Sequence, residues 1–482
     1  MTPARRHPVR LIAVFALAAA LVGAAAVTSR STSHAADSLA GVPRATCGPG
    51  SSPETGLQGQ VPKADDTSGR AAQGYWCNVA VVGHTGTSGG FKVQRYVDPA
   101  GHVCAYYDTA TMLGLTLPNL TKGVHPGVAV LDMSNSSKPV RTATLLTPAM
   151  LQPHESLLVN QARGLLVATL GSLATAPGMM DVYDVSKDCR HPVLRSTSVA
   201  NLTGHESGFA PDGRTFWSAG AAGFTLTAID LTDPARPKNI FTQTGVVYHG
   251  LRLSDDGRTL YVANMGTPDA KSTLDRPGLR ILDVSEVQDR RPKPSVRTLG
   301  ELTWPEASIP QVAEPFTRDG RQYVLENDEF TDWFGDNWKV DFFGNQVGAA
   351  RIIDVTDPRA PFLVSRLRLE VHDPAKRTSD VLADPGGNEV LKAYAAHYCG
   401  VPTRDNPRVV GCSMIASGLR LFDISDLAHP REAAYFNMPG TDGGEALSQP
   451  AWDLQRGEVW YSDAEEGFFA LRLTNGAADL LD

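Results

Sequence analysis

Short apolar runs that open on glycine recur seven times along the chain, and the clearest spans residues 278–285 (Gly-Leu-Arg-Ile-Leu-Asp-Val-Ser). Apolar runs of this length between turn-forming residues predict buried β-strands. Six copies end in aspartate, an aliphatic residue and Ser or Thr. Because glycine allows a positive φ and aspartate accepts hydrogen bonds from the following turn, we interpret both as structural, not catalytic. The copies begin at Gly127, Gly178, Gly223, Gly278, Gly348, Gly418 and Gly467.

Each glycine-led strand is preceded by a second pattern. Residues 209–217 and 253–261 carry Asp-Gly between apolar segments, and residues 317–323 repeat the motif. Asp-Gly in this setting is a strong β-hairpin signal. Most copies are followed by a proline and another short apolar run, which is typical of an outer edge strand. Each unit therefore predicts four antiparallel strands.

The spacing of these units predicts an all-β fold, a seven-bladed β-propeller over residues 75–476. Successive starting glycines are 45 to 55 residues apart, except for two intervals of 70. A four-stranded sheet repeated at this period is the signature of a propeller blade. The last unit, from about 448 to 475, supplies three strands. We expect the spare apolar segment 77–82 to complete that blade, so that an N-terminal strand closes the ring.

The glycine-led strands with their Asp, aliphatic, Ser/Thr ending resemble those of the LVIVD-repeat family. The resemblance is clearest at 278–285, 348–356 and 418–425, and it covers roughly residues 75 to 475. It implies an exported or cell-surface protein with a propeller fold. It implies no particular activity, because no catalytic motif defines the family.

The N-terminal residues predict export. Three arginines precede an apolar run from Leu11 to Val27, and Ser33-His34-Ala35 offers a small-residue cleavage site, so residues 1–35 form the expected signal peptide. Residues 36–74 are rich in Ser, Gly, Pro and Asp and predict a flexible linker. We expect a secreted or extracytoplasmic protein, anchored at the cell surface, and so at a membrane, only if the N-terminal segment is not cleaved.

The charge of the chain excludes nucleic acid as a partner. The formal net charge is −8 and the pI is near 5.9. Binding to nucleic acid without sequence preference needs a concentrated basic face, and none is present beyond the first ten residues. The expected partner is an unidentified ligand or a protein of the cell envelope.

Six cysteines follow the predicted cleavage site, and an even number in an exported chain favours disulfides. Cys399 and Cys412 stand 13 residues apart in one predicted hairpin, so we expect them to pair. Pairing of Cys77 with Cys104 is a weaker expectation, and Cys47 with Cys189 follows by elimination.

Histidines mark the start of the first strand in four of the seven units. His205 and His249 each stand eight residues before a hairpin glycine, and His154 and His397 occupy similar positions. First strands line the channel of a propeller, so these imidazoles are candidate ligands of a transition metal such as Zn, Cu or Fe. The adjacent Glu155 and Glu206 would orient the rings. The alternative is that each ring bonds the backbone of a neighbouring blade. The corresponding positions of units five and seven hold Gln311 or Val312 and Gln449, which would line the channel but are poor ligands.

An insertion in unit five, residues 328–346, combines aromatic and acidic side chains. Such a loop suits partner docking, although it would equally cover a blade edge or the channel mouth. Its aromatic residues are Trp333, Phe334, Trp338, Phe342 and Phe343.

Two functions follow from these features. The first is a ligand- or partner-binding scaffold outside the cytoplasm, supported by the repeat, the export signal and the lack of a recognised catalytic motif. The alternative is a metal-dependent oxidoreductase with a histidine cluster at the mouth of the channel.

Overall fold

A computed structural model describes residues 39–109, 126–171, 178–220, 223–266, 277–304, 309–329, 349–387, 394–440 and 444–482. The chain divides into two compact units, 1–34 and 35–482, and everything described belongs to the second. Within the described residues, no helix has the length and hydropathy needed to cross a membrane.

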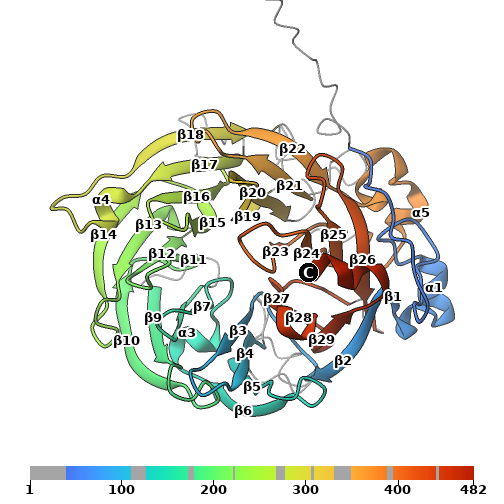
Figure 1. Ribbon diagram of the computed structural model, residues 1–482, viewed down its shortest axis with the longest axis horizontal. Helices are drawn as coiled ribbons and strands as arrows, with labels where there is room; N and C mark the ends of the chain where they lie inside the picture. The colour runs from blue at the N-terminus through green and yellow to red at the C-terminus, as the bar shows by residue number, and fades with distance from the viewer. Residues whose placement is uncertain are drawn as a thin grey trace, which may run out of the picture. The chain divides into compact units, whose positions relative to one another are not determined.

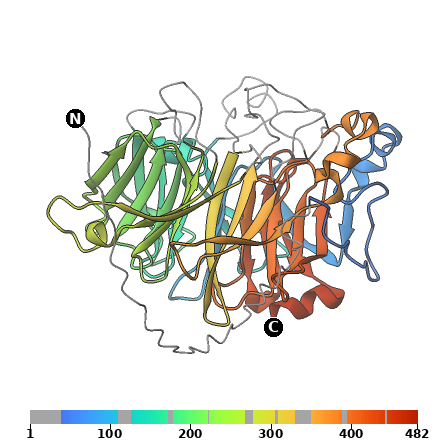
Figure 2. The same cartoon turned by 90° about the horizontal axis from the view of Figure 1, so that it is seen from above.

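Seven antiparallel sheets stand around a common axis, which confirms the predicted seven-bladed propeller of four-stranded blades (Figure 1). Seen from the side, the strands of each blade run between the two faces of the ring (Figure 2). Apolar clusters fill the spaces between neighbouring blades, as where Phe216 and Ile229 of blade three pack on Val182 of blade two. The glycine-led run is the third strand of its blade, and the first strand faces the axis.

The first three blades are β3 (Val93–Val97), β4 (Val103–Asp108), β5 (Val128–Asp132) and β6 (Val140–Leu145); β7 (Leu158–Asn160), β8 (Leu165–Thr169), β9 (Gly178–Asp184) and β10 (Val193–Asn201); and β11 (Glu206–Phe209), β12 (Thr215–Gly220), β13 (Thr225–Asp230) and β14 (Lys238–Thr244). Blades four and five are β15 (Tyr248–Leu253), β16 (Thr259–Asn264), β17 (Gly278–Asp283) and β18 (Arg297–Thr303); and β19 (Ile309–Arg318), β20 (Arg321–Glu329), β21 (Ala350–Asp354) and β22 (Phe362–Leu367). Blades six and seven contain β23 (Tyr398–Gly400), β24 (Val409–Ser413), β25 (Leu419–Asp423) and β26 (Arg431–Asn437); and β27 (Ala451–Asp453), β28 (Glu458–Asp463) and β29 (Gly467–Leu473).

The ring is closed by the N-terminal strand, as predicted. β2 (Val79–Thr85) pairs antiparallel with β29, so the two ends of the propeller share one sheet. The preceding β1 (Tyr75–Cys77) pairs with β26 and adds a fifth strand to blade six, which the sequence did not indicate. The N-terminal region therefore holds blades six and seven together.

The described part of the predicted flexible linker is ordered against blade six, which corrects that prediction. Residues 39–74 contain α1 (Lys63–Ser68) and η2 (Ala71–Gln73), and Val61 packs with Tyr435 in a buried cluster. Glu54 forms an ion pair with the buried Arg420. The segment is rich in Ser, Gly and Pro, and this composition gave no indication of the few residues that anchor it.

The remaining helices of the described residues are short. Six lie in connections and η7 follows the last strand: α3 (Pro148–Leu151), α4 (Ser285–Gln288), η4 (Glu370–His372), η5 (Pro374–Lys376), α5 (Ser379–Leu382), η6 (Leu454–Arg456) and η7 (Asn475–Leu481).

The six aspartates that follow glycine-led strands are structural, as predicted. Each accepts a hydrogen bond from the backbone N–H two residues later, at 2.8–3.0 Å. The leading glycines meet two requirements, one of them expected. Gly127, Gly418 and Gly467 have the predicted positive φ, but Gly278 does not, and a Cβ there would collide with the Leu302 carbonyl oxygen on β18. Close approach of two strands also demands glycine.

Three disulfides are present, and two of the expected pairings are wrong. Cys399–Cys412 joins β23 to β24 as predicted. Cys77 pairs with Cys47 instead of Cys104, and Cys104 pairs with Cys189. The bond from Cys77 ties the ordered N-terminal segment to β1. The bond from Cys104 joins β4 of blade one to the turn after β9 in blade two.

We predict that the double substitution Cys104→Ser/Cys189→Ser lowers the free energy of unfolding by about 2–4 kcal/mol, because this bond closes a long loop in the unfolded chain. Urea unfolding measures the change. The matched control is Cys399→Ser/Cys412→Ser, whose 13-residue separation against 85 predicts a smaller loss. Equal losses would contradict the loop-closure account, and non-reduced peptide maps that link Cys77 to Cys104 would contradict the pairing.

Candidate metal centre

The four predicted histidines converge in the central channel. His205 and His397 immediately precede β11 and β23, His249 lies in β15, and His154 lies shortly before β7. All four side chains are buried, with at most 7% of the residue exposed. The His205 ring centre is 4.5 Å from that of His154 and 4.7 Å from that of His249. His154 has a positive φ of 51°, and backbone strain of this kind is concentrated at functional sites.

Backbone carbonyls fix the orientation of three of the rings. A carbonyl can only accept a hydrogen bond, so the Nδ1 atom facing it carries the proton. In a neutral ring the Nε2 atom then presents its lone pair to the channel. Histidines that bind metals commonly donate their other N–H to a backbone carbonyl in this way. The Nδ1 contacts are His205 with Gly171 O (3.1 Å), His249 with Gln311 O (3.1 Å) and His397 with Leu447 O (2.5 Å).

Glu155 lies among the four rings and not behind them, which differs from its predicted orienting role. Its Oε2 atom receives no hydrogen bond from any described residue although the side chain is buried. A buried carboxylate oxygen without a donor requires a partner such as a proton, a water molecule or a cation. Its distances to the ring Nε2 atoms are 3.4 Å (His205), 3.5 Å (His249) and 3.9 Å (His154) from Oε2, and 3.3 Å (His397) from Oε1.

A second carboxylate, which sequence reasoning missed, completes the cluster. Glu329 ends β20 in blade five, and its oxygens are 3.1 Å from His397 Nε2 and 3.6 Å from His249 Nε2. In the sequence this glutamate falls within the aromatic insertion. The available signal was its place at the end of the second strand of the hairpin around the Asp-Gly turn at 319–320. The five aromatic residues predicted to bind a partner lie outside the described residues.

Electrostatics in the cluster favour a bound cation. The His205 and His249 Nε2 atoms are 3.0 Å apart, and both rings already donate through Nδ1. An extra proton or a metal ion is therefore needed between them. Burial, then the neighbouring His249, lowers the pKa of His205 to about 4, and burial holds the pKa of His154 well below its usual value. These two rings are neutral and available as ligands at neutral pH.

The carboxylates act in the opposite direction on His397. Burial would lower its pKa, but hydrogen bonds to Glu155 and Glu329 raise it to about 9. Burial alone would raise the pKa of Glu155, and the surrounding histidines, His249 foremost, hold it well below its usual value. The cluster therefore combines a charged carboxylate with imidazoles in both protonation states.

Gln311 and Gln449 line the channel, as the sequence indicated. Gln311 Nε2 donates to Glu155 Oε1 at 2.6 Å, so it supports the cluster without binding a metal. Gln449 lies in a separate charged layer, where its Oε1 atom accepts from Arg252 at 2.9 Å.

The charged layer also contains Glu206. Among the described residues, the Glu206 carboxylate forms no ion pair with a histidine. Its carboxylate is 2.7 Å from Lys92 Nζ and 3.3 Å from Arg252 Nη1. Arg252 also pairs with Glu314 at 2.9 Å. Lys92 is fully buried with its Nζ 3.7 Å from the centre of the Tyr398 ring, and burial lowers its pKa to about 8. Glu206 therefore neutralises buried cations and does not orient the predicted ligands.

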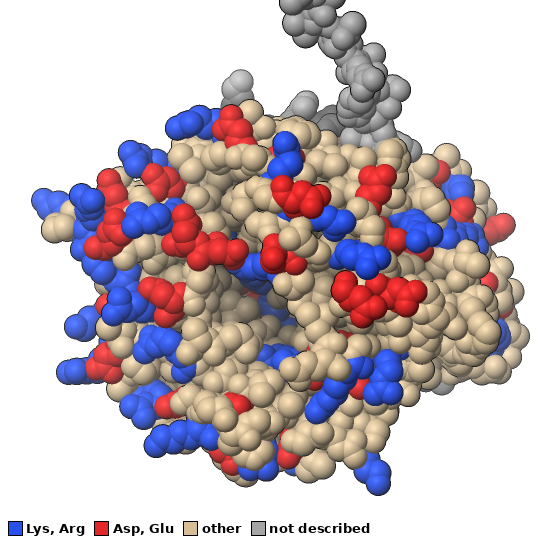
Figure 3. Space-filling model, in the orientation of Figure 1, with Lys and Arg blue, Asp and Glu red and all other residues tan. Residues whose placement is uncertain are grey.

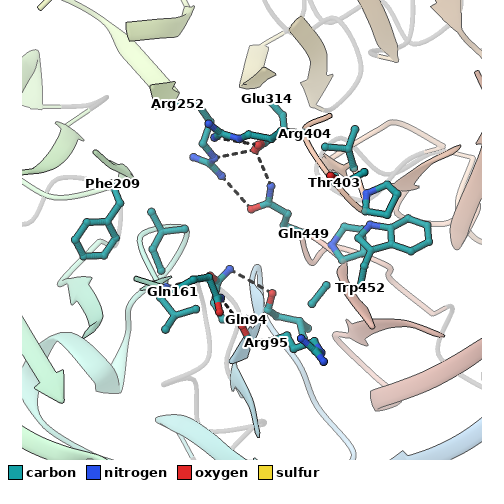
Figure 4. A pocket seen from close by; sticks show the side chains of 18 residues that line it. Gln94, Arg95, Gln161, Phe209, Arg252, Glu314, Thr403, Arg404, Gln449 and Trp452 are labelled. Carbon is teal, nitrogen blue, oxygen red and sulfur yellow. Dashed lines mark hydrogen bonds and ion pairs between the residues drawn. The ribbon is translucent and has the colours of Figure 1, made fainter. Parts of the chain in front are cut away.

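A pocket of about 570 Å³ opens beyond this layer, at the end of the channel opposite the histidines. The first strands of all blades run in the same direction along the channel, so the residues near their C-terminal ends lie at this mouth. Figure 3 shows this face hollowed at the centre of the ring, and Figure 4 shows the lining. Arg252, Glu314 and Gln449 reach the pocket from the charged layer, and Phe209 and Trp452 lie on opposite walls.

No protein-family model matches the chain, and no curated protein matches it either. Membership of the LVIVD-repeat family thus stays a prediction. Solved structures of similar fold include a hydrazine synthase from Kuenenia stuttgartiensis, at 12% identity and a TM-score of 0.50, covering 82% of this chain and 97% of that one. The β-propeller domain of Cps50 (Swd1) from Myceliophteria thermophila is 12% identical, with a TM-score of 0.47 and coverage of 83% and 99%. At these identities the similarity shows the fold alone.

We predict that Lys92→Met destabilises the protein by about 3–5 kcal/mol, because it removes one cation from a buried ion-pair network. The double variant Lys92→Met/Glu206→Gln leaves Arg252 paired with Glu314, so it should recover part of that loss. Urea unfolding of wild type and both variants measures the two effects. A single variant as stable as wild type, or a double variant that only adds a second loss, would contradict this account of the layer.

Proposed function

We propose that this chain is an extracytoplasmic metalloprotein that binds a divalent transition metal in its channel. The observation that carries the proposal is the inward-facing set of Nε2 lone pairs around the unpartnered Oε2 atom of Glu155. The alternative, that the rings only bond neighbouring backbone, accounts for the Nδ1 contacts. It leaves unexplained why two Nε2 atoms face each other beside a carboxylate.

The ligand chemistry narrows the choice of metal. Imidazole nitrogen with carboxylate oxygen suits Zn, Cu and Fe, whereas Ca and Mg prefer oxygen alone. With copper or iron the centre would be redox-active, which is the chemistry an oxidoreductase requires. With zinc it would act as a Lewis acid. Glu155 and Glu329 supply two negative charges, which balance one divalent ion in a buried site.

Location outside the cytoplasm forms part of the proposal. Three disulfides with no free cysteine indicate an oxidising environment. The predicted signal peptide over 1–35 agrees with this, and retention of that segment would anchor the protein at the cell surface. The repeated third strands support a relationship to LVIVD-repeat proteins.

We predict that chelator-treated protein binds Zn²⁺ or Cu²⁺ in stoichiometric amount and unfolds at a higher temperature in its presence, because the metal binds the folded state. His205→Ala should weaken binding by at least about tenfold. Elemental analysis after gel filtration, with calorimetric titration, measures both. His429→Ala is the matched control, since that imidazole is 74% exposed and pairs with Asp426. Wild type that retains no metal, or equal weakening in the two variants, would refute the site.

The pocket favours a second candidate function, the binding of a small ligand by the propeller as a scaffold. Its walls combine apolar side chains such as Phe209 and Trp452 with polar ones such as Arg404, above a floor of buried charged and amide groups, and this lining suits a small ligand with polar groups. We predict that a panel of small carboxylates and sugars contains a compound that changes tryptophan fluorescence, because Trp452 lines the pocket. The change should disappear in Trp452→Phe. A response that persists in this variant, or a panel without any response, would count against the pocket.

A further inference from the structure

We propose that the cluster is a two-metal centre in which Glu155 is the bridging ligand. This inference rests on the proposed metal-binding function and adds the number of ions and the ligands of each. It starts from two groups of potential ligands that share one residue. Within each group the ligand atoms lie within 4.8 Å of one another. The groups are His154, Glu155 and His205, and Glu155, Glu329 and His397.

The two oxygens of Glu155 face different ligands. Oε2 is the oxygen nearest His154 and His205, at 3.9 and 3.4 Å, whereas Oε1 is 3.3 Å from His397. A carboxylate that bridges two ions binds one through each oxygen, and two-metal sites hold their ions about 3.5–4 Å apart. Glu155 is therefore placed to bridge, with a nitrogen-rich position beside Oε2 and an oxygen-rich position beside Oε1.

His249 and Glu329 link the two positions. His249 Nε2 is 3.0 Å from His205 Nε2 and 3.5 Å from Glu155 Oε2, which assigns it to the nitrogen-rich position. It is also 3.6 Å from Glu329 Oε1, while the other oxygen of Glu329 is 3.1 Å from His397. The nitrogen-rich position thus has two imidazoles and one carboxylate oxygen within 4.8 Å of one another, with a third imidazole, that of His249, next to His205. The oxygen-rich position has one imidazole and two carboxylates.

The charges of the ions and their ligands predict the order in which the two metal ions bind. Two divalent ions bring four positive charges, and the two carboxylates offset half of them. Like charges repel strongly in a buried site, so the second ion binds more weakly than the first. Imidazole ligands favour Cu and Zn, so we expect the first ion at the nitrogen-rich position.

The test titrates metal-free full-length protein with Zn²⁺ and measures bound metal after gel filtration. We expect two equivalents in wild type and one in Glu329→Gln, which removes a ligand from the oxygen-rich position and leaves the three imidazoles and Glu155 in place. Glu301→Gln is the control, because that carboxylate is 52% exposed and pairs with Arg280. Thermal unfolding of the metal-free variants confirms that they fold.

A spectroscopic measurement on wild type makes the test independent of any variant. Protein loaded with Cu²⁺ should give the half-field electron paramagnetic resonance signal of two coupled ions. Two equivalents with this signal support the bridge. One equivalent with an isolated-copper spectrum overturns the two-metal centre and leaves the proposed metal site standing. No bound metal at all overturns both.

Discussion

The antiparallel pairing of β2 with β29 closes the propeller, because it joins the two ends of the ring in one sheet. Closure fixes seven first strands around one axis. Residues at equivalent positions in different blades then reach the same depth of the channel, however far apart they are in sequence. His154 and His397, separated by more than 240 residues, contact the same carboxylate for this reason. The candidate metal centre follows from the symmetry of the ring.

Much of the fold could be predicted because each repeat has recognisable strand and turn signals, and the repeats follow one another at a regular spacing. Glycine-led strands and Asp-Gly hairpins specify local geometry, and their period specifies the blade. The same period converts a sequence position into a depth. His205 and His249 stand at the same distance from Gly213 and Gly257, so the sequence placed them at one level of the channel. The cysteine pairings could not be predicted from the repeat. Cys104 and Cys189 lie in different blades, and their proximity depends on how the blades pack.

The chemistry of the channel was only partly accessible from sequence. A glutamate beside a histidine was expected to support the ring, but direction depends on the backbone: Glu155 turns into the cluster and Glu206 turns to Lys92. Glu329 comes from the second strand of its blade, where repeat position gives no indication of depth. Buried charges such as Lys92 look like surface residues in a sequence, and only the assembled ring supplies their partners. The structure thus defines a channel with three layers, which are a cluster of histidines and carboxylates, a charged layer and an open pocket.

Anomalous diffraction at the absorption edge of zinc, from crystals of the zinc-bound protein, shows directly whether a metal ion occupies the histidine cluster. The account predicts a peak in the channel about 2.0–2.2 Å from the Nε2 atoms of His205 and His249 and from Glu155 Oε2. Crystals with no anomalous peak in the channel, or with peaks only at exposed imidazoles such as His429, would contradict it.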